Sequence, residues 1–217
     1  MGIDYGFEEN ITHVIGIDEA GWGAIAGPLC VGGCIVRVND DLEWLIAKDS
    51  KKYTTERARE IAYTNIRRWE MEGQLETFSW SSDASEVSKD PAAALLLAQR
   101  IVCGVLLGDG ETPDKFAGVL VDGKTPVRGL ESTIPSKSIP KADSLFKVVS
   151  AASVVAKVER DREITKLGEI YKVFDFAKNK GYPTPQHLAL LREHGPTAIH
   201  RTNIHSVKEA SRINYAR

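Results

Sequence analysis

Cysteine is scarce in this chain, which has three cysteines among 217 residues, Cys30, Cys34 and Cys103. An odd number of cysteines in apolar surroundings argues against a disulfide framework and predicts buried, reduced thiols. No cluster of cysteine and histidine has the spacing of a zinc finger, so a structural zinc site is not expected. An apolar core must therefore hold the fold, and apolar residues at 42% with charged residues at 27% are typical of a globular protein.

Long hydrophobic runs are also missing. The longest apolar stretches cover residues 24–36 and 92–107. The first is shorter than the about 20 residues that cross a bilayer, and Gln99 and Arg100 interrupt the second. Residues 1–10 carry Asp4, Glu8 and Glu9 but no Lys or Arg, the reverse of a secretory signal. We expect a cytoplasmic protein without a membrane span.

The charge is nearly balanced, with a net value of −2, but it is unevenly distributed. Residues 1–120 hold 11 Lys and Arg against 20 Asp and Glu, whereas residues 121–217 hold 17 against 10. A basic part facing acidic clusters suits a polyanion gripped by cations while metal ions sit on carboxylates. The alternative is a pair of ordinary solvated faces, and composition alone leaves both open.

Hydrophobic periodicity mixes strands with helices along the whole chain. Alternating or β-branched runs predict strands at residues 14–17, 24–38, 74–81, 119–121 and 132–139. Helical spacing predicts helices at residues 55–69, 90–107, 143–167 and 186–193, the second opened by an N-cap before proline. This pattern favours an α/β layer architecture. We expect residues 1–167 to form the core and residues 168–217 a small C-terminal helical appendage of the same domain.

Carboxylates stand where predicted elements end or begin. Asp18 and Glu19 follow a strand and precede a glycine turn, Asp122 has the same placement, and Asp143 opens a helix. Each alone is equally a polar turn or a helix cap. Together they could hold two Mg²⁺ ions about 3.5–4 Å apart, the arrangement that phosphodiester hydrolysis uses. A dinucleotide cradle at Gly21 is rejected, because the preceding acids would repel a pyrophosphate and a strand follows.

Seven motifs resemble, in order, those of type 2 ribonuclease H, the bacterial ribonuclease HII. They are Gly16-Ile17-Asp18-Glu19-Ala20-Gly21, Lys48-Asp49-Ser50-Lys51-Lys52, Val121-Asp122-Gly123, Lys141-Ala142-Asp143-Ser144, Ser150-Ala151-Ala152-Ser153-Val154-Val155-Ala156-Lys157-Val158-Glu159-Arg160-Asp161, Lys180-Gly181-Tyr182-Pro183-Thr184 and His200-Arg201. The resemblance covers residues 14–208, nearly the whole chain. A related type, ribonuclease HIII, has an extra N-terminal domain, and only about 13 residues precede the first predicted strand here.

The resemblance implies a ribonuclease H-like mixed sheet flanked by helices, with Asp18, Glu19, Asp122 and Asp143 as the catalytic and metal-binding tetrad for Mg²⁺ or Mn²⁺. It also implies an endoribonuclease that cuts RNA/DNA hybrids and ribonucleotides embedded in duplex DNA, leaving a 3′-hydroxyl and a 5′-phosphate, and acting as a monomer. The substrate-binding residues that it implies are Gly21, Trp22, Gly23, Ser50, Lys51, Lys52, Ser153, Lys157 and Tyr182. Among these, Tyr182 matches the tyrosine that stacks on the sugar at the ribose–deoxyribose junction.

One departure from the family pattern lies beside the first acids. The family has Gly-Arg-Gly-Pro, whereas this chain has Gly21-Trp22-Gly23-Ala24. If the main chain of this loop contacts the 2′-hydroxyl, ribose recognition survives the change, while one phosphate-binding cation is replaced by an indole able to stack. Trp22 equally suits packing beside the turn. Two alternatives follow, an enzyme of the same family that prefers longer RNA stretches and a hybrid-binding protein without catalysis.

Overall fold

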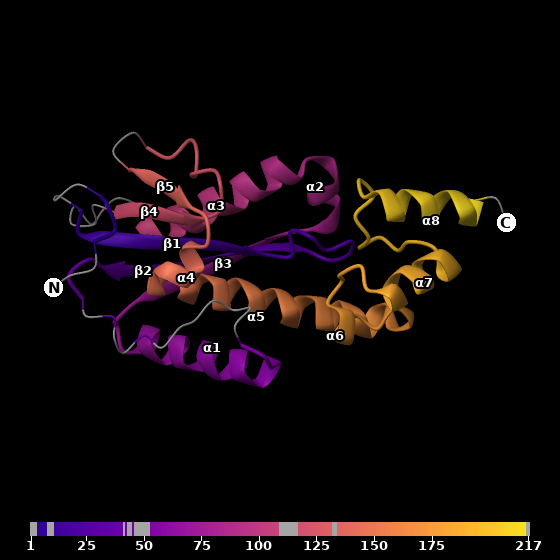
Figure 1. The fold of residues 1–217 in the computed structure, drawn as a ribbon, viewed down its shortest axis with the longest axis horizontal. Coiled ribbons are helices and arrows are strands. Elements are labelled where there is room, and N and C mark those ends of the chain that lie inside the picture. The colour runs from indigo at the N-terminus through magenta and orange to yellow at the C-terminus, as the bar shows by residue number, and fades with distance from the viewer. Residues whose placement is uncertain are drawn as a thin grey trace.

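The computed structural model describes residues 4–7, 11–40, 42, 45, 53–108, 117–131 and 134–215. Five strands form one sheet within these residues (Figure 1): β1 (His13–Ala20), β2 (Leu29–Arg37), β3 (Glu76–Ser82), β4 (Ala117–Asp122) and β5 (Ser136–Ile139). Their order is β3-β2-β1-β4-β5. β1 pairs with β2 antiparallel and with β4 parallel, β2 pairs with β3 antiparallel, and β4 pairs with β5 parallel. The predicted mixed sheet flanked by helices is confirmed.

Helices cover both faces of this sheet (Figure 1). α2 (Ala84–Lys89) and α3 (Pro91–Leu107) lie on one side, and α1 (Glu56–Met71) and α5 (Lys147–Ile170) lie on the other. Asp90 caps α3 by accepting hydrogen bonds from the backbone N–H groups of Ala92 and Ala93, as the Asp-Pro signal predicts. The apolar residues of β1 alternate between the two layers, because successive strand side chains point to opposite faces.

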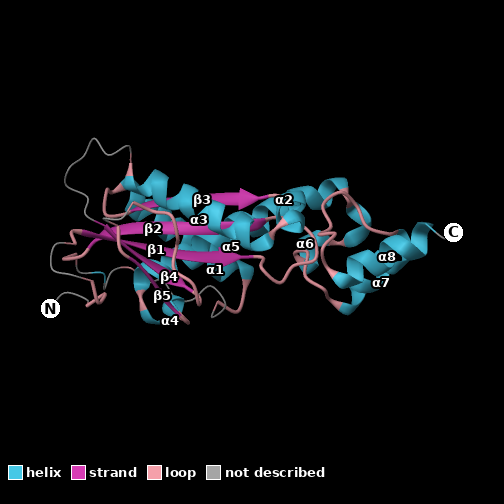
Figure 2. Cartoon of the chain, turned by 90° about the horizontal axis from the view of Figure 1, so that it is seen from above, coloured by secondary structure: helices cyan, strands magenta, loops and turns pink. Residues whose placement is uncertain are grey.

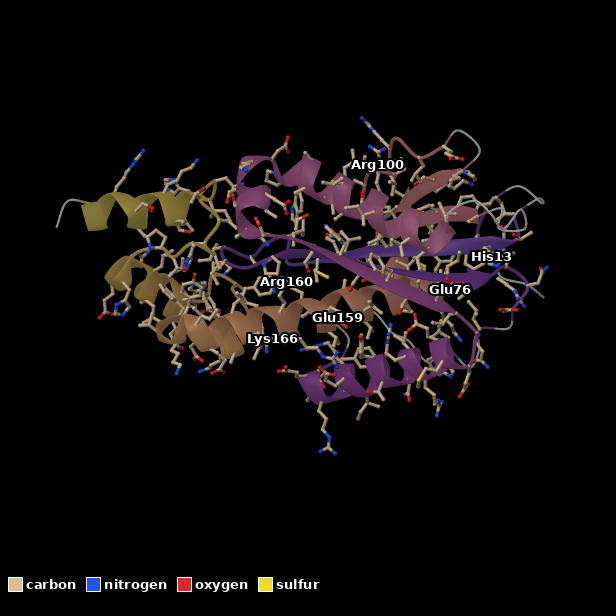
Figure 3. All side chains as sticks on the ribbon, turned by 180° about the vertical axis from the view of Figure 1, so that it is seen from behind. His13, Glu76, Arg100, Glu159, Arg160 and Lys166 are labelled. Atoms are coloured by element: carbon tan, nitrogen blue, oxygen red, sulfur yellow. The ribbon has the colours of Figure 1, made fainter. Side chains whose placement is uncertain are left out.

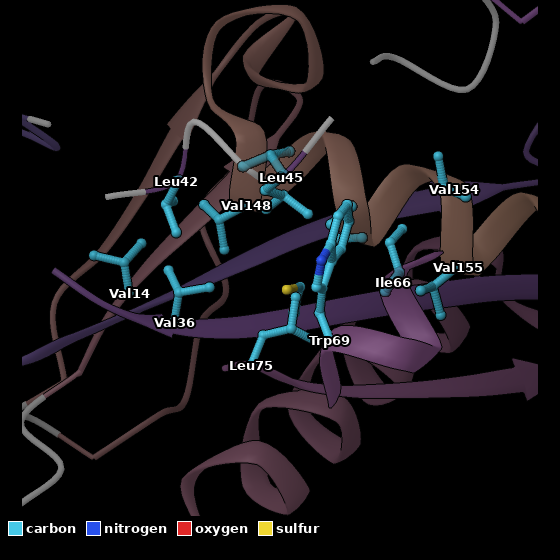
Figure 4. Packing of buried hydrophobic residues seen from close by; sticks show 14 of the residues in the cluster. Val14, Val36, Leu42, Leu45, Ile66, Trp69, Leu75, Val148, Val154 and Val155 are labelled. Atoms are coloured by element: carbon cyan, nitrogen blue, oxygen red, sulfur yellow. The ribbon is translucent and has the colours of Figure 1, made fainter. Parts of the chain in front are cut away.

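The core therefore has two parts. Val14 of β1 packs with Val36, Ile66 and Val148 between the sheet and the α1 and α5 layer (Figure 4). Ile15 and Ile17, together with Val31 and Ile35 of β2, pack against α3 through Ala98, Val102 and Leu106. The three cysteines are free and buried, as expected.

The tryptophans differ in burial, and Trp69 of α1 is 7% exposed and packs in the core. Trp80 of β3 is instead 42% exposed. Trp44 lies outside the described residues. No helix among the described residues is long and apolar enough to cross a membrane.

Two predicted elements differ from the structure. The strand expected over residues 24–38 begins only at Leu29, because the backbone N–H groups of Ile25 and Ala26 donate to the carbonyl of Gly181 instead of to a neighbouring strand. The helix expected from Asp143 is divided into α4 (Ala142–Leu145) and α5, because Phe146 is extended with φ −121° and ψ 123°.

The C-terminal part contains the 3₁₀ helix η3 (Lys172–Phe174), α6 (Phe176–Asn179), α7 (Pro185–His194) and α8 (His205–Tyr215). These elements lie beyond one end of the sheet (Figure 2). Ile25 and Ala26 belong to their apolar cluster, which also includes Ile164 of α5. The loop between β1 and β2 is thus fastened to the C-terminal part, while a boundary between core and appendage at residue 167 stays a prediction.

Candidate active site

The parallel register of β1 and β4 brings two carboxylates together. Ile17 is opposite Val121, so the next residues along the two strands, Asp18 and Asp122, stand side by side. Asp18 is 3% exposed and Asp122 is partly exposed at the end of its strand. Two acids distant in sequence therefore meet because the strands that carry them run in the same direction.

Asp143 joins this pair from α4. The backbone N–H of Ala142 donates to Oδ1 of Asp122 at 2.8 Å, which ties the start of α4 to the end of β4. Carboxylate oxygens of Asp18, Asp122 and Asp143 all lie within 4.8 Å of one another. Oxygen donors at this spacing are the ligands that Mg²⁺ and Mn²⁺ prefer, so the three side chains fit a divalent metal ion.

The electrostatics of Asp18 support that assignment. Burial, together with the nearby carboxylates of Glu19 and Asp122, raises the pKa of its carboxyl to about 8. A hydrogen bond with the Ser153 side chain and one from the Glu19 backbone N–H, at 2.8 Å, partly counteract this increase in pKa. Carboxylates this close stay charged together only with a positive partner, which a bound divalent cation supplies.

Glu19 lies outside the acidic cluster of Asp18, Asp122 and Asp143. Neighbouring strand residues face opposite sides of a sheet, and Glu19 lines a cleft of about 760 Å³ on the α3 side together with Trp22 and Asp122. The cleft and the acidic cluster are continuous through Asp122. The structure therefore brings three of the four predicted tetrad acids within 4.8 Å of one another and places the fourth at the adjoining cleft.

The loop that follows β1 is organised by two buried arginines. Arg201 donates from Nη1 to the carbonyls of Gly21 at 2.7 Å and Trp22 at 3.2 Å, and from Nη2 to that of Pro28 at 2.8 Å. Arg160, which lies between α5 and the sheet in Figure 3, donates from Nε to the same Pro28 carbonyl at 3.0 Å. Both guanidiniums are at most 1% exposed, and burial lowers their pKa values.

The sequence does not single out these two positioning residues, although both belong to motifs that resemble those of the ribonuclease HII family. Arg160 follows Lys157 in the long helical motif, and Arg201 follows His200. The local sequence carries no signal for their burial, because Arg160 stands among charged residues of α5 and Arg201 lies in a loop before α8.

Tyr182 is half-buried beside this loop. Its ring faces Nζ of Lys157, 5.3 Å from the ring centroid, and the guanidinium of Arg160, at 5.1 Å. Lys157 also forms an ion pair with Asp161 at 2.8 Å. The predicted substrate contacts Tyr182 and Lys157 thus lie together, linked to the Gly21 loop through Arg160.

Two buried histidines hold the backbone of Tyr182. The Thr197 backbone N–H donates to Nδ1 of His200 at 3.0 Å, so the proton of His200 is on Nε2. That nitrogen donates to Nε2 of His187 at 3.1 Å, and Nδ1 of His187 donates to the carbonyl of Tyr182 at 2.8 Å. Each nitrogen therefore has one role, and both rings are neutral.

The remaining predicted contacts differ in position. Ser153 is 2% exposed on α5 and bonds Asp18, while the side chain of Trp22 is 51% exposed at the cleft. On either side of Trp22, in the loop after β1, Gly21 is buried and Gly23 is exposed. Ser50, Lys51 and Lys52 lie outside the described residues.

Known proteins resemble this chain over most of its length. The family model described as Ribonuclease HII matches residues 15–208. The chain is 35% identical over 200 residues to ribonuclease HII of Idiomarina loihiensis, covering 90% of this chain and 96% of that protein. It is 34% identical over 209 residues to ribonuclease HII of Myxococcus xanthus, of which it spans 65% while 94% of this chain is covered. The crystal structure of ribonuclease H2 from Pyrococcus horikoshii superimposes with a TM-score of 0.73 at 26% identity, covering 94% of this chain and all of that one.

Proposed function

Because the chain belongs to the ribonuclease HII family of metal-dependent endoribonucleases, we propose that it cleaves the phosphodiester bond 5′ of ribonucleotides, both in RNA/DNA hybrids and singly embedded in duplex DNA. The observation that carries this proposal is the cluster of Asp18, Asp122 and Asp143, with carboxylate oxygens within 4.8 Å, at the edge of an open cleft. A buried acidic cluster would repel a nucleic acid unless cations occupied it.

We assign metal binding to Asp18, Asp122 and Asp143, with Glu19 completing the tetrad from the cleft side. Two divalent cations, Mg²⁺ or Mn²⁺, would supply the positive charge that offsets these carboxylates and the charge developing on the phosphate oxygens. Asp122 has a second role, because it also anchors the start of α4 and so fixes where Asp143 stands. Ser153 orients Asp18 through its hydrogen bond.

Recognition of the ribonucleotide is assigned to the loop at Gly21, Trp22 and Gly23 and to Tyr182. The buried arginines donate hydrogen bonds to the backbone carbonyls of Gly21, Trp22 and Pro28. These bonds hold the loop in place without substrate. Tyr182 offers a half-buried ring beside Lys157, an arrangement that suits stacking next to a phosphate. Ser50, Lys51 and Lys52 remain proposed phosphate contacts, and a monomeric, cytoplasmic enzyme stays a prediction.

Trp22 favours a second candidate, an enzyme of this family that prefers longer RNA stretches. Its indole is 51% exposed where the family has an arginine, so one cation that would hold a phosphate is absent. A panel of four substrates, each tested with Mg²⁺, with Mn²⁺ and with EDTA, separates the candidates: an RNA/DNA hybrid, a duplex with four ribonucleotides, a duplex with one ribonucleotide, and all-DNA. Cleavage of the single-ribonucleotide duplex supports the first, cleavage only of longer RNA supports the second, and binding without cleavage in either metal contradicts both.

A further inference from the structure

The cleft beside the acidic cluster combines apolar side chains with polar and charged ones. Its apolar lining includes Trp22 of the loop after β1, Leu95 and Leu96 of α3, and Pro126 of the loop after β4. Its volume of about 760 Å³ is within the range of about 300–1,000 Å³ typical of sites for small molecules. The acidic cluster alone does not account for such a surface, since metal ligands need no apolar walls.

Gln99 gives this cleft a specific polar group. The side chain of Gln99 projects from α3, is only 6% exposed and lines the cleft. In the part of the chain that the structure describes, its amide makes no hydrogen bond. The amide nitrogen and oxygen of Gln99 keep contact with solvent through the cleft, so its donors and its acceptor are available to a bound ligand.

Two cations complete the lining. Lys124 and Arg128 follow β4 and are exposed at the cleft, and neither forms an ion pair with any described residue. Lys157 and Arg162 on the α5 side do have carboxylate partners. Unpaired cations beside an indole and an amide match the three parts of a nucleotide: phosphate, base face and base edge.

We propose that the cleft bounded by Trp22, Gln99, Lys124 and Arg128 is a subsite for one unstacked nucleotide of the substrate. The indole covers the base face, the Gln99 amide pairs with the base edge, best with adenine, and the two cations hold its phosphate. Because Glu19 and Asp122 line the same cleft, this nucleotide is adjacent to the scissile bond.

This inference rests on the proposed function, which supplies the substrate: the nucleotide that enters the cleft belongs to the nucleic-acid strand that contains the ribonucleotide. A base paired inside a duplex cannot enter a cleft, so the nucleotide must leave the stack, at a cost of a few kcal/mol that is lowest at a mismatch. The enzyme should therefore prefer a ribonucleotide whose neighbouring nucleotide is mismatched or unpaired. Where that nucleotide is adenine, the preference should be greatest.

Binding is tested without metal, so that no cleavage occurs. The probes are adenosine 5′-monophosphate and ribose 5-phosphate, and the readout is the indole N–H NMR signal that disappears in Trp22→Phe. We expect the mononucleotide to shift this signal and Gln99→Leu to weaken its affinity about tenfold, as expected for the loss of a bidentate pair. Gln74→Leu is the matched control, because Gln74 is exposed after α1 on the opposite side of the sheet. An equal shift by ribose 5-phosphate, or equal affinities in the two leucine variants, overturns the subsite.

Cleavage in Mg²⁺ provides the second measurement. The ratio of kcat/KM for a mismatched neighbour to that for a paired neighbour should exceed one and fall toward one in Gln99→Leu but not in Gln74→Leu. If Gln99→Leu leaves this ratio unchanged, the subsite is contradicted even when the enzyme cleaves well. If the protein binds the mononucleotide through Gln99 but cleaves no ribonucleotide-containing substrate, the proposed function is contradicted and the subsite is not.

Discussion

A Cβ atom on residue 21 would lie 2.0 Å from Nε of Arg160, so Gly21 and the buried guanidinium share a space that no larger residue can occupy. Gly21 also has φ +94°, a conformation that side chains rarely adopt. Gly21→Ala should therefore displace Arg160 and with it the loop carbonyls that this arginine holds. We expect the free energy of unfolding to fall by about 2 kcal/mol or more, measured by urea denaturation.

The control for Gly21→Ala is Gly23→Ala, compared for stability alone. Nothing lies within 4 Å of a Cβ at position 23, and its φ is not positive. Equal losses of stability in the two variants would contradict the steric role of Gly21.

Asp122→Asn tests the acidic cluster. The amide keeps the size of the side chain and removes one negative charge from a pocket that faces phosphate, so cleavage should be lost while binding of the duplex persists or tightens. Cleavage and binding are measured separately, the second in EDTA. Asp83→Asn, which changes a helix cap of α2, is the charge-matched control. Turnover near that of the unmodified enzyme in Asp122→Asn would exclude this acid from catalysis.

Tyr182→Ala should weaken substrate positioning more than folding. Loss of a stacking ring costs about 1–3 kcal/mol, and we expect the largest effect on cleavage at a single embedded ribonucleotide. Tyr182→Phe, which keeps the ring, should retain most activity. If the activity of the alanine variant instead follows its thermal midpoint, Tyr182 is a core residue and not a substrate contact.

Trp22→Arg restores the cation of the family pattern. One additional phosphate contact should steepen the decrease of log affinity with log salt concentration by about 0.9 for B-form DNA. Cleavage of a lone ribonucleotide should rise relative to cleavage of a run of four, compared at one salt concentration. An unchanged salt slope together with an unchanged substrate ranking would mean that the residue at this position only packs beside the turn.

The histidine pair predicts an acid-dependent loss of stability. Burial, and then the neighbouring His187, lowers the pKa of His200 to about 4 from its usual 6.5. As the pH falls below 6.5, His200 becomes protonated in the unfolded chain but stays neutral in the folded one. The free energy of unfolding therefore decreases until the pH reaches about 4. The expected loss from His200 is about 3 kcal/mol.

Urea denaturation between pH 7.5 and pH 4.5 measures this dependence. His200→Gln should be less stable at neutral pH but should lose less stability on acidification, since it removes the group that titrates. His205→Gln is the control, because His205 lies at the exposed start of α8. Parallel pH dependences in the unmodified protein and His200→Gln would exclude the pair as the cause.

Local sequence determined much of this protein. The Asp-Pro pair of residues 90 and 91 begins α3 where it predicts a helix, since an N-cap and a proline act within one turn. The motifs around Asp18, Asp122 and Asp143 indicated the family and its acids, because residue identity and order are properties of sequence. Trp22 was recognisable as a departure for the same reason.

Only the tertiary structure decided how these pieces meet. The register that sets Ile17 opposite Val121 makes Asp18 and Asp122 neighbours, and it depends on pairing between strands about 100 residues apart. The burial of Arg160 and Arg201 required carbonyls from the loop at residues 21–28, and the amide of Gln99 became significant only where α3 faces the cleft. Whether a buried polar group finds a hydrogen-bond partner depends on contacts between segments that are distant in sequence. No local sequence pattern specifies such contacts.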